Sequence, residues 1–258
     1  QTRVVSHSIF NHQIPQFMTN GLDRVALENI DARSPYVWPN KSVHYAMRNN
    51  HLPVHWWRGV GAPKNQFAVE GHVDELAHAA GADPIQFRLD NIPADSHFRH
   101  PLEVVRDKSN WTQDLGRGEG MGVAMGEAFG TIVAMVSFVT VSRRGQLRVE
   151  EVDFAVDCGH VVNPLTVDMQ MESSLVYGLT AALYGDMTIQ GGRIVEENFD
   201  KMLMLKMNEM PIVRTHLALR GGDAWGGIGE PGTGPVAGSI ANAVFSATGK
   251  RIYNLPIR

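Results

Sequence analysis

Apolar residues recur at the spacing of a helix in several stretches of the chain. Residues 62–80, 166–184 and 236–245 each carry apolar side chains three or four positions apart, which predicts helices with a buried face. Gly81 supplies a stop for the first of these helices. A shorter helix is predicted over 85–91, because the Asp-Pro pair before it combines a good N-cap residue with a proline suited to the first turn.

Continuous apolar runs predict the strands. Residues 131–141 and 147–156 are two such runs separated by a short polar turn, which predicts a β-hairpin. A second hairpin is predicted over 187–195, around a pair of glycines. Residues 1–55 have only short extended pieces between prolines, so we expect strands and long loops there.

The pattern breaks between residues 93 and 120, where prolines, histidines and a glycine-rich loop interrupt any long run. We place the internal boundary here, which gives two α+β parts, residues 1–115 and 116–258. Later in the chain, methionines are frequent between Met202 and Met210, and we expect these flexible apolar side chains to fill a core.

Composition and charge exclude several classes of protein. The chain has 43% hydrophobic residues, enough for packed cores, and 23 Lys and Arg against 27 Asp and Glu, so a nucleic-acid-binding surface is not indicated. Cys158 is the only cysteine in the sequence. A cysteine-rich zinc or iron–sulfur site therefore needs a partner chain. We also find no apolar run of the roughly 20 residues that a membrane span requires.

The glycine-rich segment Gly227–Gly232 formally matches the dinucleotide-binding pattern G-x-G-x-x-G. We reject this interpretation, because residues 220–225 are not a buried strand and a complete βαβ unit does not fit before the end of the sequence. What remains is Glu230, a carboxylate in a loop that Pro231 stiffens just ahead of a helix. Glu230 is either a charged residue that interacts with a helix N-terminus or a rigidly placed general base.

Another segment offers candidate ligand-binding residues. Trp56–Gly61 places Arg58 and two glycines immediately before a helix, where the backbone could approach an anionic ligand. The alternative is a helix-entry turn with aromatic packing. Gln170 follows Asn163-Pro164 on a predicted helix, and taken alone it is an ordinary buried glutamine that bonds to the backbone.

Other polar clusters are given structural interpretations. His72, Asp74, Glu75 and His78 lack zinc-protease spacing, and we expect a solvated helix face there, with no metal. The sequence contains no G-x-S-x-G motif, which argues against a serine hydrolase.

These motifs together resemble a known family. Residues 227–233, followed by 241–245 and 247–251, resemble the C-terminus of xanthine oxidase family large subunits. The branch with isoquinoline oxidoreductases and bacterial membrane-associated aldehyde dehydrogenases is the most similar. The resemblance implies an α+β fold in which helices pack on mixed sheets, as in the molybdopterin-binding domain of aldehyde oxidase and xanthine dehydrogenase.

The resemblance also implies roles for single residues. Glu230 takes the position of the catalytic general base, and Arg58, Gly59, Gly61, Gln170 and Gly229 take cofactor-binding positions. Ser173 and Ser174 stand where many members have glycine or other small residues, which is a departure from the family pattern.

The implied activity is hydroxylation of an aldehyde or an N-heteroaromatic compound with oxygen from water. The implied cofactor is molybdenum–molybdopterin in its cytosine dinucleotide form, and the implied partners are the N-terminal half of the large subunit, a small iron–sulfur subunit and, in some members, a cytochrome c. Two glycine-rich cofactor segments of the complete subunit, Gly-Gly-Phe-Gly and Gly-Gln-Gly, do not occur in this sequence. We therefore expect an excerpt, a processed half or a separately encoded half. The resemblance implies a periplasmic location, and the alternative is the cytoplasm. The alternative is a noncatalytic scaffold half.

Overall fold

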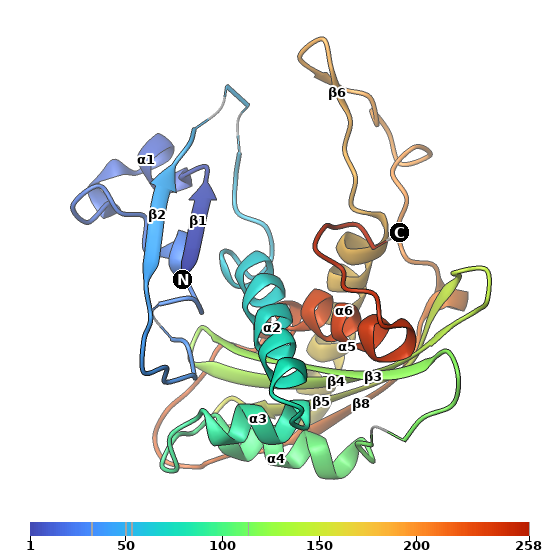
Figure 1. The fold of residues 1–258 in the computed structure, drawn as a ribbon. Coiled ribbons are helices and arrows are strands. Elements are labelled where there is room, and N and C mark those ends of the chain that lie inside the picture. The colour runs from blue at the N-terminus through green and yellow to red at the C-terminus, as the bar shows by residue number, and fades with distance from the viewer. Residues whose placement is uncertain (32, 50, 53, 113, 258) are drawn as a thin grey trace.

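A four-stranded sheet forms the centre of the molecule (Figure 1). Its order is β3 (Glu119–Ala128), β4 (Thr131–Val141), β5 (Leu147–Asp157) and β8 (Ile212–Leu217). The first three strands are antiparallel, and β8 pairs in parallel with β5, so the sheet is mixed. The predicted α+β class and the predicted β4–β5 hairpin are confirmed. The computed structural model describes residues 1–31, 33–49, 51–52, 54–112 and 114–257.

Side chains of β4 alternate between two hydrophobic cores, as the period of a strand requires. Val133 and Met135 point to one face of the sheet, where they pack against α5 (Pro164–Tyr184) and α6 (Val236–Thr248). Both helices lie where apolar spacing predicts them. This face carries the larger of the two cores, and the site described below lies at its edge.

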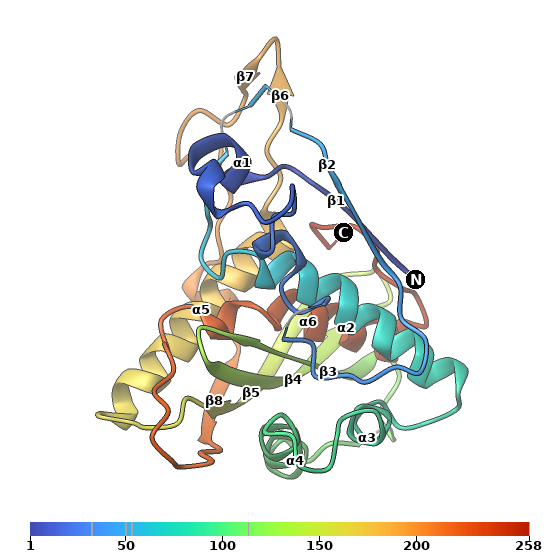
Figure 2. The same cartoon turned by 90° about the vertical axis from the view of Figure 1, so that its left-hand side faces the viewer.

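Ile132 and Ala134 point to the opposite face, which α3 (Pro84–Asp90) and α4 (Arg99–Lys108) cover (Figure 2). Helix α3 is confirmed with its cap, because the Asp83 carboxylate accepts hydrogen bonds from two backbone N–H groups of its first turn, both at 2.9 Å. Residues from both sides of position 115 share this core. The predicted boundary there stays a prediction.

The segment 93–120, where we expect no long pattern, contains a regular helix in its interior and the start of a strand at its end. Helix α4 forms despite its charged sequence, because Leu102 and Val105 are fully buried three positions apart and Pro101 lies in the first turn, where proline is tolerated. Strand β3 begins at Glu119 and contains several glycines. A side chain at Gly120 or Gly122 would collide with the backbone of α6, so these glycines let the helix lie directly on the strand.

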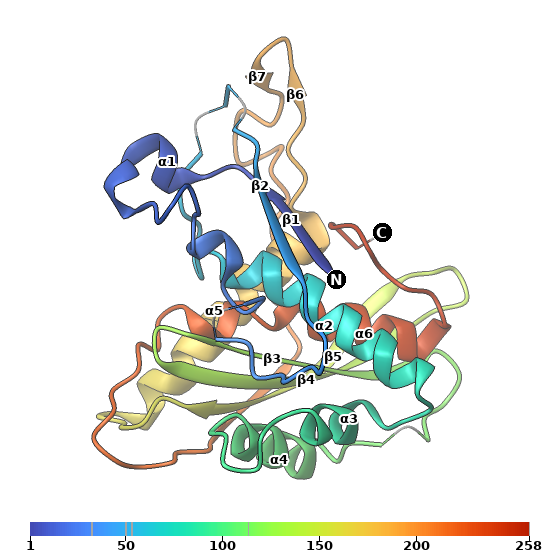
Figure 3. The same ribbon diagram turned by 60° about the vertical axis from the view of Figure 1, so that its left-hand side comes forward.

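An N-terminal layer stands beside α2 (Ala62–Ala79), a helix that matches its predicted range almost residue for residue (Figure 3). The layer contains the parallel strands β1 (Thr2–Ser6) and β2 (Val43–Met47), which fits the expectation of short strands and long loops. It also contains short helical turns, namely α1 (Ile9–Gln13), η1 (Pro15–Phe17) and η2 (Val25–Leu27). A small core at Val4, Leu27 and Ile30 joins the layer to Val69 of α2.

A long arm rises from the end of α5 on the same side of the sheet as the N-terminal layer (Figures 1 and 3). Its tip is the predicted hairpin, β6 (Ile189–Gln190) and β7 (Arg193–Ile194), and its return ends in the 3₁₀ turn η3 (Met207–Glu209). The prediction that the methionines here fill a core is wrong for three of them, because Met202, Met204 and Met207 are exposed.

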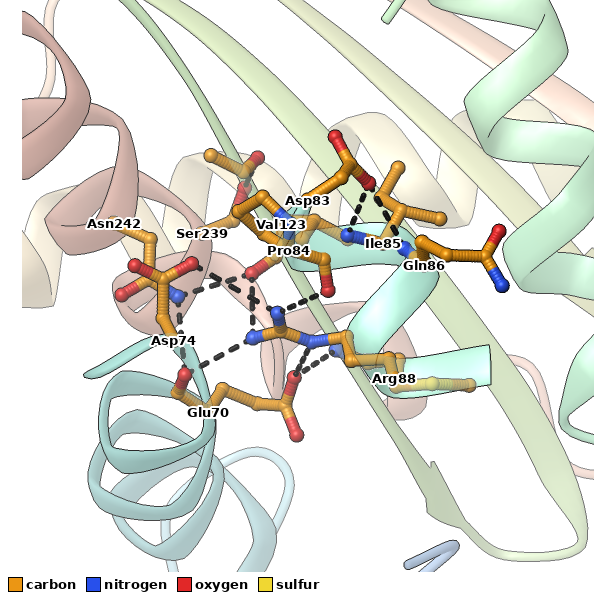
Figure 4. Close-up of polar contacts among 12 residues, drawn as sticks. Glu70, Asp74, Asp83, Pro84, Ile85, Gln86, Arg88, Val123, Ser239 and Asn242 are labelled. Atoms are coloured by element: carbon orange, nitrogen blue, oxygen red, sulfur yellow. Dashed lines mark hydrogen bonds and ion pairs between the residues drawn. The ribbon is translucent and has the colours of Figure 1, made fainter. Parts of the chain in front are cut away.

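A buried ion-pair network connects α2, α3, β3 and α6 (Figure 4). The fully buried guanidinium of Arg88 donates to the Glu70 carboxylate at 3.0 Å and to backbone oxygens of Pro84, Glu70 and Val123. Glu70 also accepts from the hydroxyl of Tyr36 at 2.8 Å. The pKa of Arg88 lies above its usual value, because the neighbouring carboxylates more than offset the effect of burial. Every member is charged or hydrogen-bonded, which suits a dry interior.

Candidate functional site

Three segments that are far apart in the sequence meet around the middle of α5. Arg58 and Gly59 lie in the turn before α2, Gly229 and Glu230 lie just before the 3₁₀ turn η4 (Pro231–Thr233), and Gln170 lies in the first half of α5. The structure therefore brings together five of the six residues selected from the sequence.

Arg58 is the centre of the cluster. Its Nε donates to the carbonyl of Gly229 at 2.7 Å, its Nη2 to Oε1 of Gln170 at 3.0 Å, and its Nη1 to Oγ of Ser173 at 2.8 Å. The guanidinium also lies over the ring of Tyr177, with Cζ 5.0 Å from the ring centroid. One cation thus fixes the glycine-rich loop against α5.

The Glu230 carboxylate is held by the backbone of the Arg58 segment. Its Oε2 accepts a hydrogen bond from the N–H of Gly59 at 2.8 Å, and the side chain is partly buried. Burial lowers the pKa of Arg58, while the charges of Tyr177 and Glu230 oppose that shift. Glu230 makes no side-chain cap bond to the 3₁₀ turn that follows it, so the interpretation of Glu230 as a charge on that N-terminus is not supported.

Gly59 is required by the geometry of this turn. Its φ is +93°, a conformation that side chains other than glycine rarely adopt, and an added Cβ would lie 2.6 Å from Cγ of Pro63. Aromatic packing also contributes to the turn, because Trp56 packs edge-on against Phe10 and Trp57 packs against Tyr177. The two interpretations of this segment are therefore compatible.

Gly61 does not join the cluster through any contact recorded among the described residues. It is buried, its N–H donates to Oε2 of Glu28 at 3.2 Å, and an added Cβ would collide with the carbonyl of Val25. Burial raises the pKa of Glu28. The glycine at this position lets α2 begin against η2.

Comparison with known proteins identifies the family. Models of the molybdopterin cofactor-binding domain match residues 9–92 and residues 59–211, and the second match alone spans more than half of the chain. The chain belongs to the molybdopterin cofactor-binding domain family of xanthine oxidase type large subunits.

Relatives of this molybdopterin cofactor-binding domain are subunits of larger enzymes. The beta subunit of isoquinoline 1-oxidoreductase from Brevundimonas diminuta is 31% identical over 238 residues, which cover 91% of this chain and 29% of the relative. A nicotinate dehydrogenase subunit from Pseudomonas putida is 31% identical over 220 residues, which cover 78% of this chain and 18% of the relative. The chain thus spans less than a third of the length of these curated relatives.

Solved structures confirm the fold of the domain. Aldehyde oxidoreductase from Desulfovibrio gigas superposes with a TM-score of 0.74 at 17% identity, covering 90% of this chain and 44% of the other. The aldehyde oxidoreductase of Desulfovibrio desulfuricans gives a TM-score of 0.75 at 14% identity, covering 99% and 45%. At such low identity the likeness supports the architecture alone.

Sequence reasoning missed two residues of the site on α5. Ser173 and Tyr177 lie three and seven positions after Gln170 and therefore on the same face of the helix. Ser173 was noted only as a departure from the family pattern, yet its hydroxyl contacts Arg58. Helical spacing from Gln170 was the signal that could have found both.

Gln66 packs beside the loop that carries Glu230, and it was not selected from the sequence as a site residue. Its side chain is 1% exposed and lies between Gly126 and Gly234, where an added Cβ at either glycine would collide with the amide. Its Oε1 and the buried Oγ1 of Thr233 have no hydrogen-bond partner among the described residues. Two acceptor-capable atoms are therefore buried beside the turn that carries Glu230.

The acidic and histidine residues of α2 do not form one solvated face. Asp74 is 5% exposed and accepts from Arg251 at 2.6 Å, so the interpretation of that face is wrong for Asp74.

Within the described residues, no group of three or more His, Cys, Asp or Glu is placed to hold a metal ion. In the same part of the chain, none of the helices is long and apolar enough to cross a membrane.

Proposed function

We propose that this chain is the part of a molybdenum hydroxylase that encloses one side of the molybdopterin cofactor and supplies the general base. The complete enzyme oxidises an aldehyde or an N-heteroaromatic compound with oxygen from water. The single observation that carries the proposal is the convergence of Arg58, Gly59, Gln170, Gly229 and Glu230 on one cluster. Membership of the family supports it.

The donor set of the cluster fits an anionic heterocyclic cofactor. Gly229 is exposed, and an added Cβ there would meet only Oε1 of Gln170 at 3.9 Å, so the loop leaves open space on that side. Gln170 and Arg58 border the same space with an amide and a cation, groups that recognise heterocycle edges and phosphates. The bound cofactor supplies the redox chemistry, and the protein supplies position and proton transfer.

Each residue has a distinct task in this proposal. Arg58 holds the glycine-rich loop against α5 and supplies positive charge. Gln170 hydrogen-bonds to the edge of the heterocycle. Gly59 fixes the Glu230 carboxylate through Oε2, which leaves Oε1 to take up a proton during the reaction. A base held by a backbone N–H in a partly buried turn loses little entropy when it acts.

The cofactor form, partners and compartment belong to the same proposal. We infer the cytosine dinucleotide form of the cofactor, the N-terminal half of the large subunit, a small iron–sulfur subunit and a cytochrome c as partners, and a periplasmic location. The sequence has a single cysteine, Cys158, so an iron–sulfur cluster requires another chain. The isoquinoline and nicotinate relatives are each named as one subunit of an enzyme, which supports a multi-chain assembly. A third relative, of Gluconacetobacter polyoxogenes, is a membrane-bound aldehyde dehydrogenase.

The substitution Glu230→Gln in the assembled enzyme tests the proposal. It keeps the size of the side chain and removes the base, so we expect turnover to fall by roughly 10²–10⁴-fold, the usual contribution of a general base. Molybdenum content measured by elemental analysis stays unchanged. Glu103→Gln on α4 is the matched control, because Glu103 lies on the opposite face of the sheet and pairs only with Arg99 among recorded contacts. Unchanged turnover in Glu230→Gln would refute the role of this residue.

One observation favours the scaffold alternative and gives it a direct test. Nε, Nη1 and Nη2 of Arg58 all donate to protein acceptors, including the Ser173 hydroxyl where many relatives have a small residue. A scaffold half that binds no cofactor would retain this satisfied arginine. Stoichiometric molybdenum in the native complex excludes a pure scaffold, and absence of molybdenum excludes the hydroxylase.

A further inference from the structure

We propose that the arm of residues 187–207, together with the cavity at its base, is the surface on which the remainder of the large subunit packs. We call this surface the arm surface. Its occupant is an apolar polypeptide segment from the part of the subunit that this chain does not match. The proposal deepens the proposed function, since it names where the partner half of the same site docks.

The arm exposes a row of large apolar side chains. Met207 is 96% exposed, Phe199 82% and Leu203 61%. The other exposed apolar residues of the arm are Met187, Ile189, Ile194, Val195, Met202 and Met204. So many apolar side chains on one projection are unusual for a surface that faces only water, and they are typical of a protein–protein contact. Flexible methionines suit such a contact because they adapt to the shape of a partner.

A cavity of about 500 Å³ lies between the arm and the second half of α5. Phe199, Leu203 and Met204 line it from the arm, and Trp57 and Tyr177 line it from the body. Its walls are mostly apolar, with Asp186, Glu196 and Lys201 also among the lining residues, and such a cavity accepts the side chains that anchor an interface. The arm surface therefore has both a projecting ridge and a pocket.

The arm is held by hydrogen bonds near its base. Oη of Tyr184 donates to Oε1 of Glu209 at 2.5 Å, and the N–H of Leu205 donates to Oγ1 of Thr180 at 3.3 Å. The tip has a ladder of two residue pairs between β6 and β7. An isolated two-stranded hairpin is marginally stable in water, so a projecting arm of this kind gains its order from a partner.

The arm surface is continuous with the candidate functional site, which identifies the partner. Trp57 and Tyr177 pack together with ring centroids 6.2 Å apart, and Arg58 lies over the same Tyr177 ring. The body that covers the exposed side of Gly229 and Ser173 must therefore also pass the cavity. In the isoquinoline relative this chain corresponds to 29% of the subunit, so the covering body has ample polypeptide to supply. We assign the arm surface to that polypeptide, whether it belongs to the same chain or to a separate one.

Site-specific photo-crosslinking in the native complex tests the assignment. Leu203 is replaced with p-benzoylphenylalanine in one preparation and Phe199 in a second, and cross-linked peptides are identified by mass spectrometry. Val37, which is 63% exposed and donates its N–H to the carbonyl of Asn91 at the end of α3, carries the same probe as the control. We expect both arm positions to link to the large subunit outside the matched region, and the control not to do so.

Links from both arm positions to the iron–sulfur subunit, to a second copy of this chain or to phospholipid would overturn the assignment, as would the absence of any cross-linked peptide.

Hydrogen exchange gives a second measure of whether the arm surface is covered in the complex. The double substitution Phe199→Ser with Leu203→Ser should speed exchange over 187–207 by at least tenfold in the complex, while Val37→Ser leaves that exchange unchanged. Equal exchange in all variants would also overturn it. Neither readout depends on molybdenum or turnover, so failure here is separate from failure of the proposed function.

Discussion

At the scale of single residues, the site depends on backbone conformations as much as on side chains. Arg58, Gln170 and Glu230 could be selected from the sequence, because a cation, an amide and a carboxylate in distinctive motifs are visible without a structure. Ser173 and Tyr177 share the helical face of Gln170, but only the structure shows that this face of α5 meets Arg58. Gly59 and Gly61 were selected from one motif, but they differ in the structure. The N–H of Gly59 holds Glu230, whereas Gly61 packs against the carbonyl of Val25.

The substitution Gly59→Ala tests the backbone requirement. An alanine at φ +93° is strained, and its Cβ meets Pro63 at 2.6 Å, so we expect unfolding free energy to fall by about 1–3 kcal/mol in urea denaturation. Turnover should fall as well, because the N–H that holds Glu230 moves.

Gly71→Ala on α2 is the control for this substitution. It has open space at the Cβ position and a helical backbone, so it should raise unfolding free energy by about 0.5–1 kcal/mol. A Gly59→Ala variant that is as stable and active as the control would show that the turn tolerates a side chain.

At the scale of elements, apolar spacing predicted α2 and α6, which have no side-chain N-cap, while cap residues followed by proline marked the starts of α3 and α5. Asp83 and Asn163 each accept backbone N–H groups of the helix that follows, and both helices were predicted. Strand β3 was missed because its glycines weaken the strand signal, and they are there because α6 and Gln66 approach the backbone. Such an approach between distant segments leaves no periodic pattern in the sequence.

The Arg88 network makes the packing of four elements depend on one buried cation. Arg88→Met leaves the Glu70 carboxylate buried without its ion partner, so we expect a loss of about 3–5 kcal/mol in unfolding free energy. Adding Glu70→Gln to that variant removes the unpaired charge and should recover part of the loss. A double-mutant cycle from urea denaturation measures the coupling. A loss below about 1 kcal/mol for Arg88→Met would contradict the importance of the pair.

The hydrogen bond at the base of the arm gives a pH-dependent signal. Donation to Glu209 raises the pKa of Tyr184 to about 12, and the same bond lowers the pKa of Glu209. A raised tyrosine pKa stabilises the folded state below the usual value of 10 and loses that contribution as pH rises through 12. A lowered glutamate pKa stabilises above the usual value of 4.5 and loses that contribution as pH falls through the folded pKa. The base of the arm is therefore held most firmly between these limits.

Tyrosinate absorbance at 295 nm checks this expectation. The difference between the titrations of the native protein and of Tyr184→Phe should show one group ionising near pH 12, and Glu209→Gln should return it toward 10. A difference curve centred at 10 in the native protein would show that the bond does not form.

At the scale of the whole molecule, the central sheet and the N-terminal layer are built with different degrees of burial. Strand β4 has a strand on each side and an apolar core on each face, so its amides are enclosed in every direction. Strands β1 and β2 form a two-stranded parallel sheet, with Val5 65% exposed. Parallel strands are usually buried on both faces. Sequence patterns predicted β4, β5 and short strands in the N-terminal layer, but they missed β3 and β8 and did not show which strands would be enclosed.

Hydrogen exchange followed by mass spectrometry should therefore show slow amide exchange in the enclosed sheet and fast amide exchange in the N-terminal layer. Amides of β4 and β5 should exchange only through global unfolding, while those of β1 and β2 open locally and exchange at least a hundredfold faster. Helices α3 and α4 belong to the core on the second face of the sheet, which they share with β3 and β4, so they should follow the slow group although they precede position 115. If instead α3 and α4 exchanged together with β1 and β2, the predicted boundary near residue 115 would mark a real change in stability, and the shared core would contribute less than its burial indicates.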